Sequence, residues 1–400
     1  MSSLRDEIQR RILRKRIGDD RNNIIGVEIK SRRKKQAITL EALSNDVCSQ
    51  SYLCKIETNK IAPNREFLRE ICERLELTGE KLDNLFMLKD IILGVVKALI
   101  KNDIEFINEA YEDGEGLENY RFSIVKLAYY LANKKIGQAE AVYEELQEVT
   151  RSMPDFDLGV FAVLSSLLSY YKADFMETID VLSVIDESDV PREISMLKNM
   201  IDFKTRIAIN SHEAPYYYEK VKRDLYDYGY YNQYEENLYL IGLYFARNKC
   251  ESAFNETMSR MNNSINITSL KCIKDFYDDD ITTLIEANNS MLNEFTKTMK
   301  FVIARQYDNK NEIDADCDFY RVDYNSLLLQ YLLCEDYKEK VDFIFKNGIP
   351  MATMSNNNFM KNYFINELMK MPIGIGKSRN IGKAYVMAYG SGKIVLESGE

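Results

Sequence analysis

Apolar side chains recur at helical spacing along most of this 400-residue sequence. Near the start, Leu4, Ile8 and Ile12 are four residues apart among arginines and lysines, a pattern typical of a basic amphipathic helix. A loosely ordered basic tail is the alternative, because such arms are commonly disordered. Polar residues 18–23 interrupt the pattern, so we expect an N-terminal basic arm over residues 1–23.

Five short helices are predicted in close succession between residues 24 and 88. The first carries Ile29 and continues through a basic run. Thr39 and Ser49 are suitable N-caps for a second and a third helix. A fourth and a fifth helix follow, starting near Pro63 and Thr78. Two short helices joined by three or four residues define a helix-turn-helix geometry.

The stretch from Thr39 to Pro63 resembles the Cro/cI-repressor (XRE) helix-turn-helix family. The residues that match the family pattern are Thr39, Ala42, Leu43, Ser49, Leu53, Ile56, Glu57, Lys60 and Pro63. The resemblance covers about residues 24–88 and implies a lambda-repressor-like DNA-binding domain. It also implies that Arg33 of the first helix pairs with Glu57, which we interpret as a structural ion pair.

Three positions depart from the family pattern. Leu40 stands where the family often has a glutamine that contacts phosphate, and Cys54 replaces a serine or threonine. Asn59 replaces the usual glycine after the recognition helix. Asparagine also accepts the left-handed backbone conformation, so this last departure is compatible with the turn.

The exposed positions of the third helix are suited to DNA. Gln50 can hydrogen-bond base edges in a major groove, Lys55 can reach guanine or phosphate, and Ser51 and Tyr52 suit backbone oxygens. The predicted DNA-binding residues are Thr39, Ser49, Gln50, Ser51, Tyr52, Lys55 and Lys60. The alternative is a structural helical domain with a polar face.

Beyond residue 88 the sequence predicts a connecting helix, 89–112, and a helical region, 113–371. An internal repeat places a large residue nine positions before a smaller one, with a polar turn between two helices, in the pairs Tyr130 and Ala139, Tyr170 and Ile179, Tyr244 and Ala253, Leu332 and Val341. This spacing resembles tetratricopeptide repeats and predicts an all-α solenoid. A generic helical bundle is the alternative. The Gly-rich segment 372–400 is expected to form a tail or a small hairpin.

Charge is unevenly distributed along the chain. Residues 1–60 contain 14 Lys or Arg and 8 Asp or Glu, a net charge of +6, whereas residues 61–400 carry −16. A basic head on an acidic body is expected when one small domain meets nucleic acid and the rest does not. Chance clustering on a solvated face is the alternative interpretation.

Few residues suggest other chemistry. A single histidine and seven cysteines without a CxxC pair argue against histidine-based catalysis, a zinc site or a disulfide framework. Gly376-Lys377-Ser378 lacks the spacing of a phosphate loop, and Asp278–Asp280 lacks that of a calcium site. We therefore expect a non-enzymatic cytoplasmic protein without cofactor, metal or membrane segment.

A helix-turn-helix head on a tetratricopeptide-like body resembles the peptide-pheromone-responsive regulators of Gram-positive bacteria (Rgg, PlcR and relatives, RRNPP). The resemblance implies a homodimer that binds double-stranded DNA and a short peptide effector. The residues expected near the concave, ligand-binding side are Lys172, Asn325 and Gln330. The competing interpretation is a helical-repeat scaffold or sensor whose head serves mainly in assembly.

Overall fold

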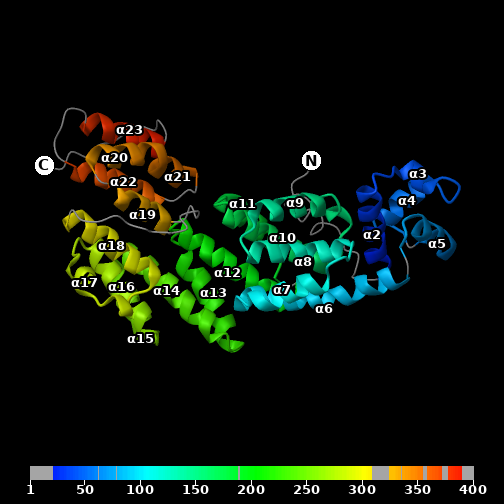
Figure 1. Ribbon diagram of the computed structural model, residues 1–400, viewed down its shortest axis with the longest axis horizontal. Coiled ribbons are helices and arrows are strands. Elements are labelled where there is room, and N and C mark those ends of the chain that lie inside the picture. Colours follow the sequence, from blue (N-terminus) through cyan, green and yellow to red (C-terminus); the bar gives the residue numbers. More distant parts are fainter. Residues whose placement is uncertain are drawn as a thin grey trace. The chain divides into compact units, whose positions relative to one another are not determined.

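Helices make up all the regular structure that the computed structural model describes (Figure 1). The described residues are 21–61, 63–77, 79–187, 190–308, 324–334, 336–354, 358–371 and 377–389. They divide into two compact units, the first comprising the described residues within 1–171 and 177–201 and the second those within 172–176 and 202–400. The predicted basic arm falls almost wholly outside the described residues.

The head begins the first unit and consists of short helices, as predicted. These are α2 (Arg21–Lys35), α3 (Leu40–Ser44), α4 (Gln50–Glu57) and α5 (Arg65–Arg74). Ile29, Leu43, Leu53, Ile56 and Ile71 meet in its core, each at most 1% exposed. Leu40 packs at the edge of this core. The helix-turn-helix fold predicted from sequence is confirmed.

Helix α6 (Gly79–Lys101) runs through the boundary expected at residue 88. Leu85, Leu88, Ile92 and Val95 are all buried along it, so one apolar stripe continues without a break. The helix ends only at Asn102, whose φ of 58° is left-handed, and α7 (Ile104–Asp113) follows. The separate connecting helix expected over 89–112 is therefore the end of α6 together with α7.

The rest of the first unit is built from helical hairpins. Its elements are α8 (Tyr120–Ala132), α9 (Ile136–Gln147), a short 3₁₀ helix η1 (Thr150–Ser152), α10 (Asp155–Tyr171), α11 (Phe175–Ser183) and α12 (Arg192–Ala208), whose last residues belong to the second unit.

The second unit continues the helical pattern. Its helices are α13 (Ala214–Asp227), α14 (Tyr231–Arg247), α15 (Glu251–Arg260), α16 (Ser264–Tyr277), α17 (Thr282–Glu286), η2 (Asn289–Met291), α18 (Glu294–Asp308), α19 (Tyr324–Leu333), α20 (Tyr337–Phe343), the π-helix η3 (Ile344–Gly348), α21 (Ile349–Met354), α22 (Asn358–Lys370) and α23 (Lys377–Tyr389).

Three of the predicted repeat turns are present, and each contains a residue in the left-handed backbone conformation. Lys134, Ala173 and Lys249 sit between paired helices with φ between 53° and 59°. The left-handed residue lets the next amide N–H reach back to the preceding helix, as in the 2.8 Å bond from Lys135 N to Tyr130 O. The predicted turn at 335–336 includes position 335, which lies outside the described residues.

The C-terminal part differs from the expected tail or hairpin. Residues 377–389 form helix α23, in which Ala384 and Ala388 are buried one turn apart. This helix packs on α21 and α22. The small side chains of Ala384 and Ala388 lie on one face of α23 and allow close contact with its neighbours. This packing favours a helix over the strand that the alternating sequence pattern suggested. Residues 372–376 and 390–400 lie outside the described residues.

Gly26 marks the close approach of α2 to the end of α4. A methyl group at this position would lie 2.5 Å from the carbonyl oxygen of Ile56 and would overlap Asn59 Oδ1. We expect Gly26→Ala to lower the free energy of unfolding by about 1–3 kcal/mol through overpacking. The control Gly137→Ala adds a methyl group in open space on α9, where the helix should gain up to about 1 kcal/mol. Urea titrations of both variants check this, and equal stabilities would contradict the close approach.

Candidate nucleic-acid interface

The α3–α4 pair is held by two capping side chains. Thr39 Oγ1 accepts a 3.1 Å hydrogen bond from the N–H of Ala42, and Ser49 Oγ accepts one of the same length from the N–H of Tyr52. Both cap residues have extended backbone and begin their helices as predicted. Each hydroxyl uses its oxygen for the cap, so its hydrogen can be donated to a phosphate.

Helix α4 has one buried and one exposed face. Leu53, Ile56 and Glu57 are buried, whereas Gln50, Ser51, Cys54 and Lys55 are exposed. Lys60 is also exposed, just beyond the helix. The structure thus brings the predicted polar side chains together on the outer face of the second helix of the pair, the face that enters a major groove in helix-turn-helix proteins.

Tyr52 differs from its neighbours. Its ring is half-buried and packs edge-on against Phe67 of α5, with ring centroids 5.6 Å apart. Its hydroxyl oxygen accepts a 2.9 Å hydrogen bond from the N–H of Asn64, the N-cap of α5. Tyr52 therefore joins α4 to α5, and only the hydrogen of its hydroxyl remains to contact DNA.

Arg33 and Glu57 form the ion pair implied by the family resemblance. Arg33 Nε and Nη2 donate to the two carboxylate oxygens of Glu57 at 2.6 and 2.8 Å, and Nη1 donates to the carbonyl of Ile38 at 3.0 Å. The hydrogen bonds to Glu57 raise the pKa of Arg33 further. Both side chains are buried, so the pair fixes α2 against α4.

Asn59 connects the end of α4 to the body, a contact that sequence reasoning missed. Its φ is 55°, in the left-handed region expected for this position. Its side-chain Nδ2 donates to the carbonyl of Ser152 in η1 at 2.5 Å. A glycine could make the turn but not this bond. In the sequence, the only indication of this contact is the asparagine at a position where the helix-turn-helix family usually has glycine.

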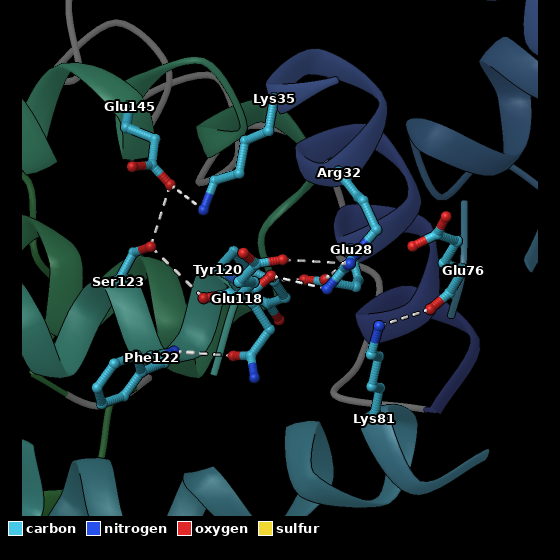
Figure 2. A network of polar contacts seen from close by, with 11 residues as sticks. Glu28, Arg32, Lys35, Glu76, Lys81, Glu118, Tyr120, Phe122, Ser123 and Glu145 are labelled. Carbon is cyan, nitrogen blue, oxygen red and sulfur yellow. Dashed lines mark hydrogen bonds and ion pairs between the residues drawn. The ribbon is translucent and has the colours of Figure 1, made fainter. Parts of the chain in front are cut away.

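The basic run of α2 faces acidic residues of the body (Figure 2). Lys35 Nζ lies 2.5 Å from Glu145 Oε1, as Figure 2 shows. Lys34 Nζ lies 3.2 Å from Glu148 Oε2. Arg32 Nη2 donates to the carbonyl of Glu118 at 3.0 Å. These partly exposed pairs contribute little stability each. They direct the cations of α2 towards the first unit's own helices rather than to the face that carries Gln50.

Beneath these pairs, Glu28 is almost fully buried, with 1% of its surface exposed. Its Oε2 accepts a 3.1 Å hydrogen bond from the N–H of Tyr120 at the start of α8 (Figure 2), and Arg32 Nε lies 3.5 Å from its Oε1. Burial raises the pKa of the Glu28 carboxyl to about 7, although these two partners oppose the shift.

Tyr120 and Arg121 carry this buried network into the body. Both bond to Asp157 Oδ2 of α10, Tyr120 through its hydroxyl at 2.6 Å and Arg121 through Nε at 3.0 Å. Burial and the charge of Asp157 raise the pKa of Tyr120 well above its usual range. Arg121 Nη1 also donates to the carbonyl of Leu85 in α6. Helix α8 is thus bonded to α2 of the head through Glu28, to α10 through Asp157 and to α6 through Leu85.

The predicted ligand-binding residues and the Asp278–Asp280 run lie outside the head. Lys172 is exposed in the turn after α10, Gln330 is half-buried in α19, and Asn325 lies in the first turn of that helix. Their grouping at a ligand site stays a prediction. Asp278 and Asp279 are paired with lysines, and Asp280 accepts a hydrogen bond from the N–H of Thr282. In the described part of the chain, no cluster of metal-binding side chains occurs, and no helix has the length and apolarity needed to span a bilayer.

Part of the chain is similar in sequence to a known transcription regulator. It is 25% identical to the transcriptional activator NprA of Geobacillus stearothermophilus over 146 residues, which are 34% of this chain and 36% of that protein. The match thus spans about a third of the relative's length. It agrees with the resemblance drawn from the sequence motifs. No protein-family model matches the chain.

Two solved structures also align with it. The apo form of the competence regulator ComR from Streptococcus vestibularis has a TM-score of 0.37 at 14% identity, covering 64% of this chain and 99% of that one. PlcR of Bacillus thuringiensis, solved in complex with the peptide PapR7 and DNA, has a TM-score of 0.31 at 16% identity, covering 64% and 98%.

The raised pKa of Glu28 predicts a specific pH dependence. The folded carboxyl has a pKa of about 7 against a usual 4.5. Between these pH values the unfolded chain loses its proton while the folded chain keeps it, so stability falls as pH rises. The loss should reach about 3 kcal/mol above pH 7. Glu28→Gln keeps an acceptor for Tyr120 N–H and should remove this slope.

Hydrogen exchange of the α2 and α8 amides between pH 5 and pH 8 measures the effect, after correction for intrinsic exchange rates. Glu118→Gln is the matched control, because Glu118 is 77% exposed and should leave the slope unchanged. Parallel pH profiles for Glu28→Gln and the wild type would contradict the prediction.

Removing one member of the Arg33–Glu57 pair should strongly destabilise the head. Glu57→Ala leaves the Arg33 guanidinium buried without its carboxylate, at a cost of about 3–5 kcal/mol. The double change Arg33→Met, Glu57→Met replaces both charges by apolar groups and should cost much less. Thermal unfolding followed by circular dichroism checks this order. A single variant as stable as the double variant would show that the pair is not structurally coupled.

Proposed function

We propose that this chain is a sequence-specific DNA-binding transcription regulator whose α4 reads the major groove. The observation that carries the proposal is the exposed polar face of α4, with Gln50, Ser51 and Lys55 held outward by a capped and packed helix pair. The similarity to the transcriptional activator NprA supports the same function.

Each proposed contact follows from its position. Gln50 is the first residue of α4, where recognition helices meet base edges, and its amide suits adenine N6 and N7. Lys55 is five residues further along the exposed face and suits guanine or phosphate. The hydroxyls of Thr39, Ser49, Ser51 and Tyr52, together with Lys60, would bind the DNA backbone and set the register.

The body is proposed to dimerise and to bind a regulatory ligand, a short peptide. Two heads related by a twofold axis would read half-sites separated by one or more helical turns, about 34 Å each. Stacked helical hairpins present extended surfaces, which suit both dimerisation and peptide binding. The peptide would act by shifting the population between head arrangements.

A scaffold with the head used for assembly remains the competing function, and the buried Glu28–Tyr120 contact favours it, since the head is packed into the first unit. DNA affinity separates the two functions. A scaffold needs no exposed amide at the start of α4.

Gln50→Ala should weaken binding to a selected DNA site by about 1–3 kcal/mol and relax preference at one base pair. Lys55→Ala should weaken binding more evenly, and if Lys55 contacts a phosphate, it should lower the salt dependence by about one counterion. Fluorescence anisotropy with sites chosen by in vitro selection measures both.

The matched controls are Gln138→Ala and Lys101→Ala, which are exposed on α9 and α6. They should leave DNA affinity unchanged. If Gln50→Ala and Lys55→Ala also leave affinity and sequence preference unchanged, α4 does not read DNA and the scaffold interpretation stands.

A further inference from the structure

A cavity in the second unit, lying on α13 and reaching α14 and the end of α15, has no part in the proposed DNA contact. Its volume is about 710 Å³, within the range of small-ligand pockets. The lining residues that matter here are Tyr216, Lys220, Arg223, Tyr226, Tyr234 and Arg260. The residues predicted for the ligand from sequence, such as Gln330, lie elsewhere. Most of the lining comes instead from α13, which packs on α14.

Three tyrosine rings line the cavity, Tyr226 beside Tyr234 and Tyr216 ten residues earlier on α13. Tyr216 and Tyr226 are each 61% exposed although they belong to a well-packed helix. The ring of Tyr226 meets that of Tyr234 with centroids 6.2 Å apart at a steep angle. Exposed tyrosines offer large, rigid contact area at low entropic cost and are enriched where proteins bind partners. A flat or apolar group would cover these rings.

Cations line the cavity beside these rings. Lys222 is paired with Glu219, and Arg260 is paired with Glu256. Lys220 Nζ lies over the ring of Tyr216, 5.3 Å from its centroid. Arg223 is exposed, and among the described residues no carboxylate pairs with it. A guanidinium in this position can bind a carboxylate with two parallel hydrogen bonds.

Spacing along α13 places these groups side by side. Tyr216, Lys220 and Arg223 follow one another at i, i+4 and i+7, which is one face of a helix. Asp227 continues that face and also lines the cavity. The cavity can therefore accommodate a carboxylate opposite Arg223 and a cationic or amide group near Asp227. A peptide carries both kinds of group, whereas a phosphate ion carries only negative charge.

We propose that this cavity binds a short peptide, with its carboxylate on Arg223 and Lys220 and an aromatic or apolar side chain against Tyr226 and Tyr234. The proposal rests on the proposed function in assuming that the chain takes a peptide ligand, and it assigns that ligand to α13–α15. The carboxylate is either the peptide's carboxyl terminus or an acidic side chain.

Calorimetric titration of the full chain with three peptide probes tests whether the site binds a carboxylate. It also tests whether that carboxylate is the peptide's carboxyl terminus or an acidic side chain. The probes are Ala-Ala-Phe as the free acid, Ala-Ala-Phe-amide, and acetyl-Asp-Ala-Phe-amide. At least one of the two carboxylate probes should bind about tenfold or more tightly than Ala-Ala-Phe-amide. Tighter binding of the free acid identifies the carboxyl terminus, and tighter binding of the aspartyl probe identifies an acidic side chain.

Variants then locate the binding. Arg223→Gln and Tyr226→Ala should each weaken the preferred probe about tenfold or more. Lys271→Gln and Tyr337→Ala, exposed elsewhere in the second unit, should leave it unchanged. Circular dichroism confirms that each variant is folded, and Tyr226→Phe, which keeps the ring, should restore binding.

The proposal is overturned if all three probes bind equally, if none binds at millimolar concentration, or if Arg223→Gln leaves affinity unchanged. Competition by inorganic phosphate at the same concentration as the peptide would also overturn it, because the cavity would then be a general anion site. DNA affinity of Arg223→Gln is measured in parallel. A wild-type chain that binds DNA but does not distinguish the three probes would refute this site alone, whereas unchanged DNA affinity in Gln50→Ala and Lys55→Ala would refute the regulator function.

Discussion

Helix α2 has to satisfy the core of the head and the surface of the body at the same time, and much of the first unit depends on that constraint. Ile29 lies in the head core, while the preceding residue, Glu28, is buried against Tyr120. Neighbouring residues of a helix point about 100° apart, so both sides of α2 are covered. Buried polar groups at such a junction need partners, and here the N–H of Tyr120 supplies one for Glu28 Oε2.

The same junction reaches the proposed DNA-reading helix. Arg33 ties α2 to Glu57 at the end of α4, and two residues later Asn59 bonds to Ser152 of η1. Movement of the head away from α8 and η1 would leave Glu28 and Asn59 without these hydrogen bonds, and each loss in a buried setting costs free energy. Any ligand that repositions the head must therefore offset the loss of several buried contacts.

Local chemistry was enough to predict much of the head. Thr39 and Ser49 are caps because a hydroxyl at an extended residue can accept a helix N–H, whatever the rest of the chain does. The outward positions of Gln50 and Lys55 follow from helical periodicity once Leu53 and Ile56 are inside. The turns at Lys134 and Lys249 follow from polar residues between apolar helices. In contrast, α6 continues past the boundary expected at residue 88 on one unbroken apolar stripe, and α23 is a helix where a tail or hairpin was expected, because it packs on α21 and α22.

The sequence by itself determined the helix-turn-helix head, its caps, the side chains on the outer face of α4, and a body of helical hairpins, since these rest on interactions within a few residues. Tertiary structure alone decided that Tyr52 braces α5, that the basic run of α2 meets Glu145 and Glu148, and that Glu28 is buried with a raised pKa. Each of these joins residues from separate helices. No short-range pattern specifies which distant side chain will fill the space beside a given helix.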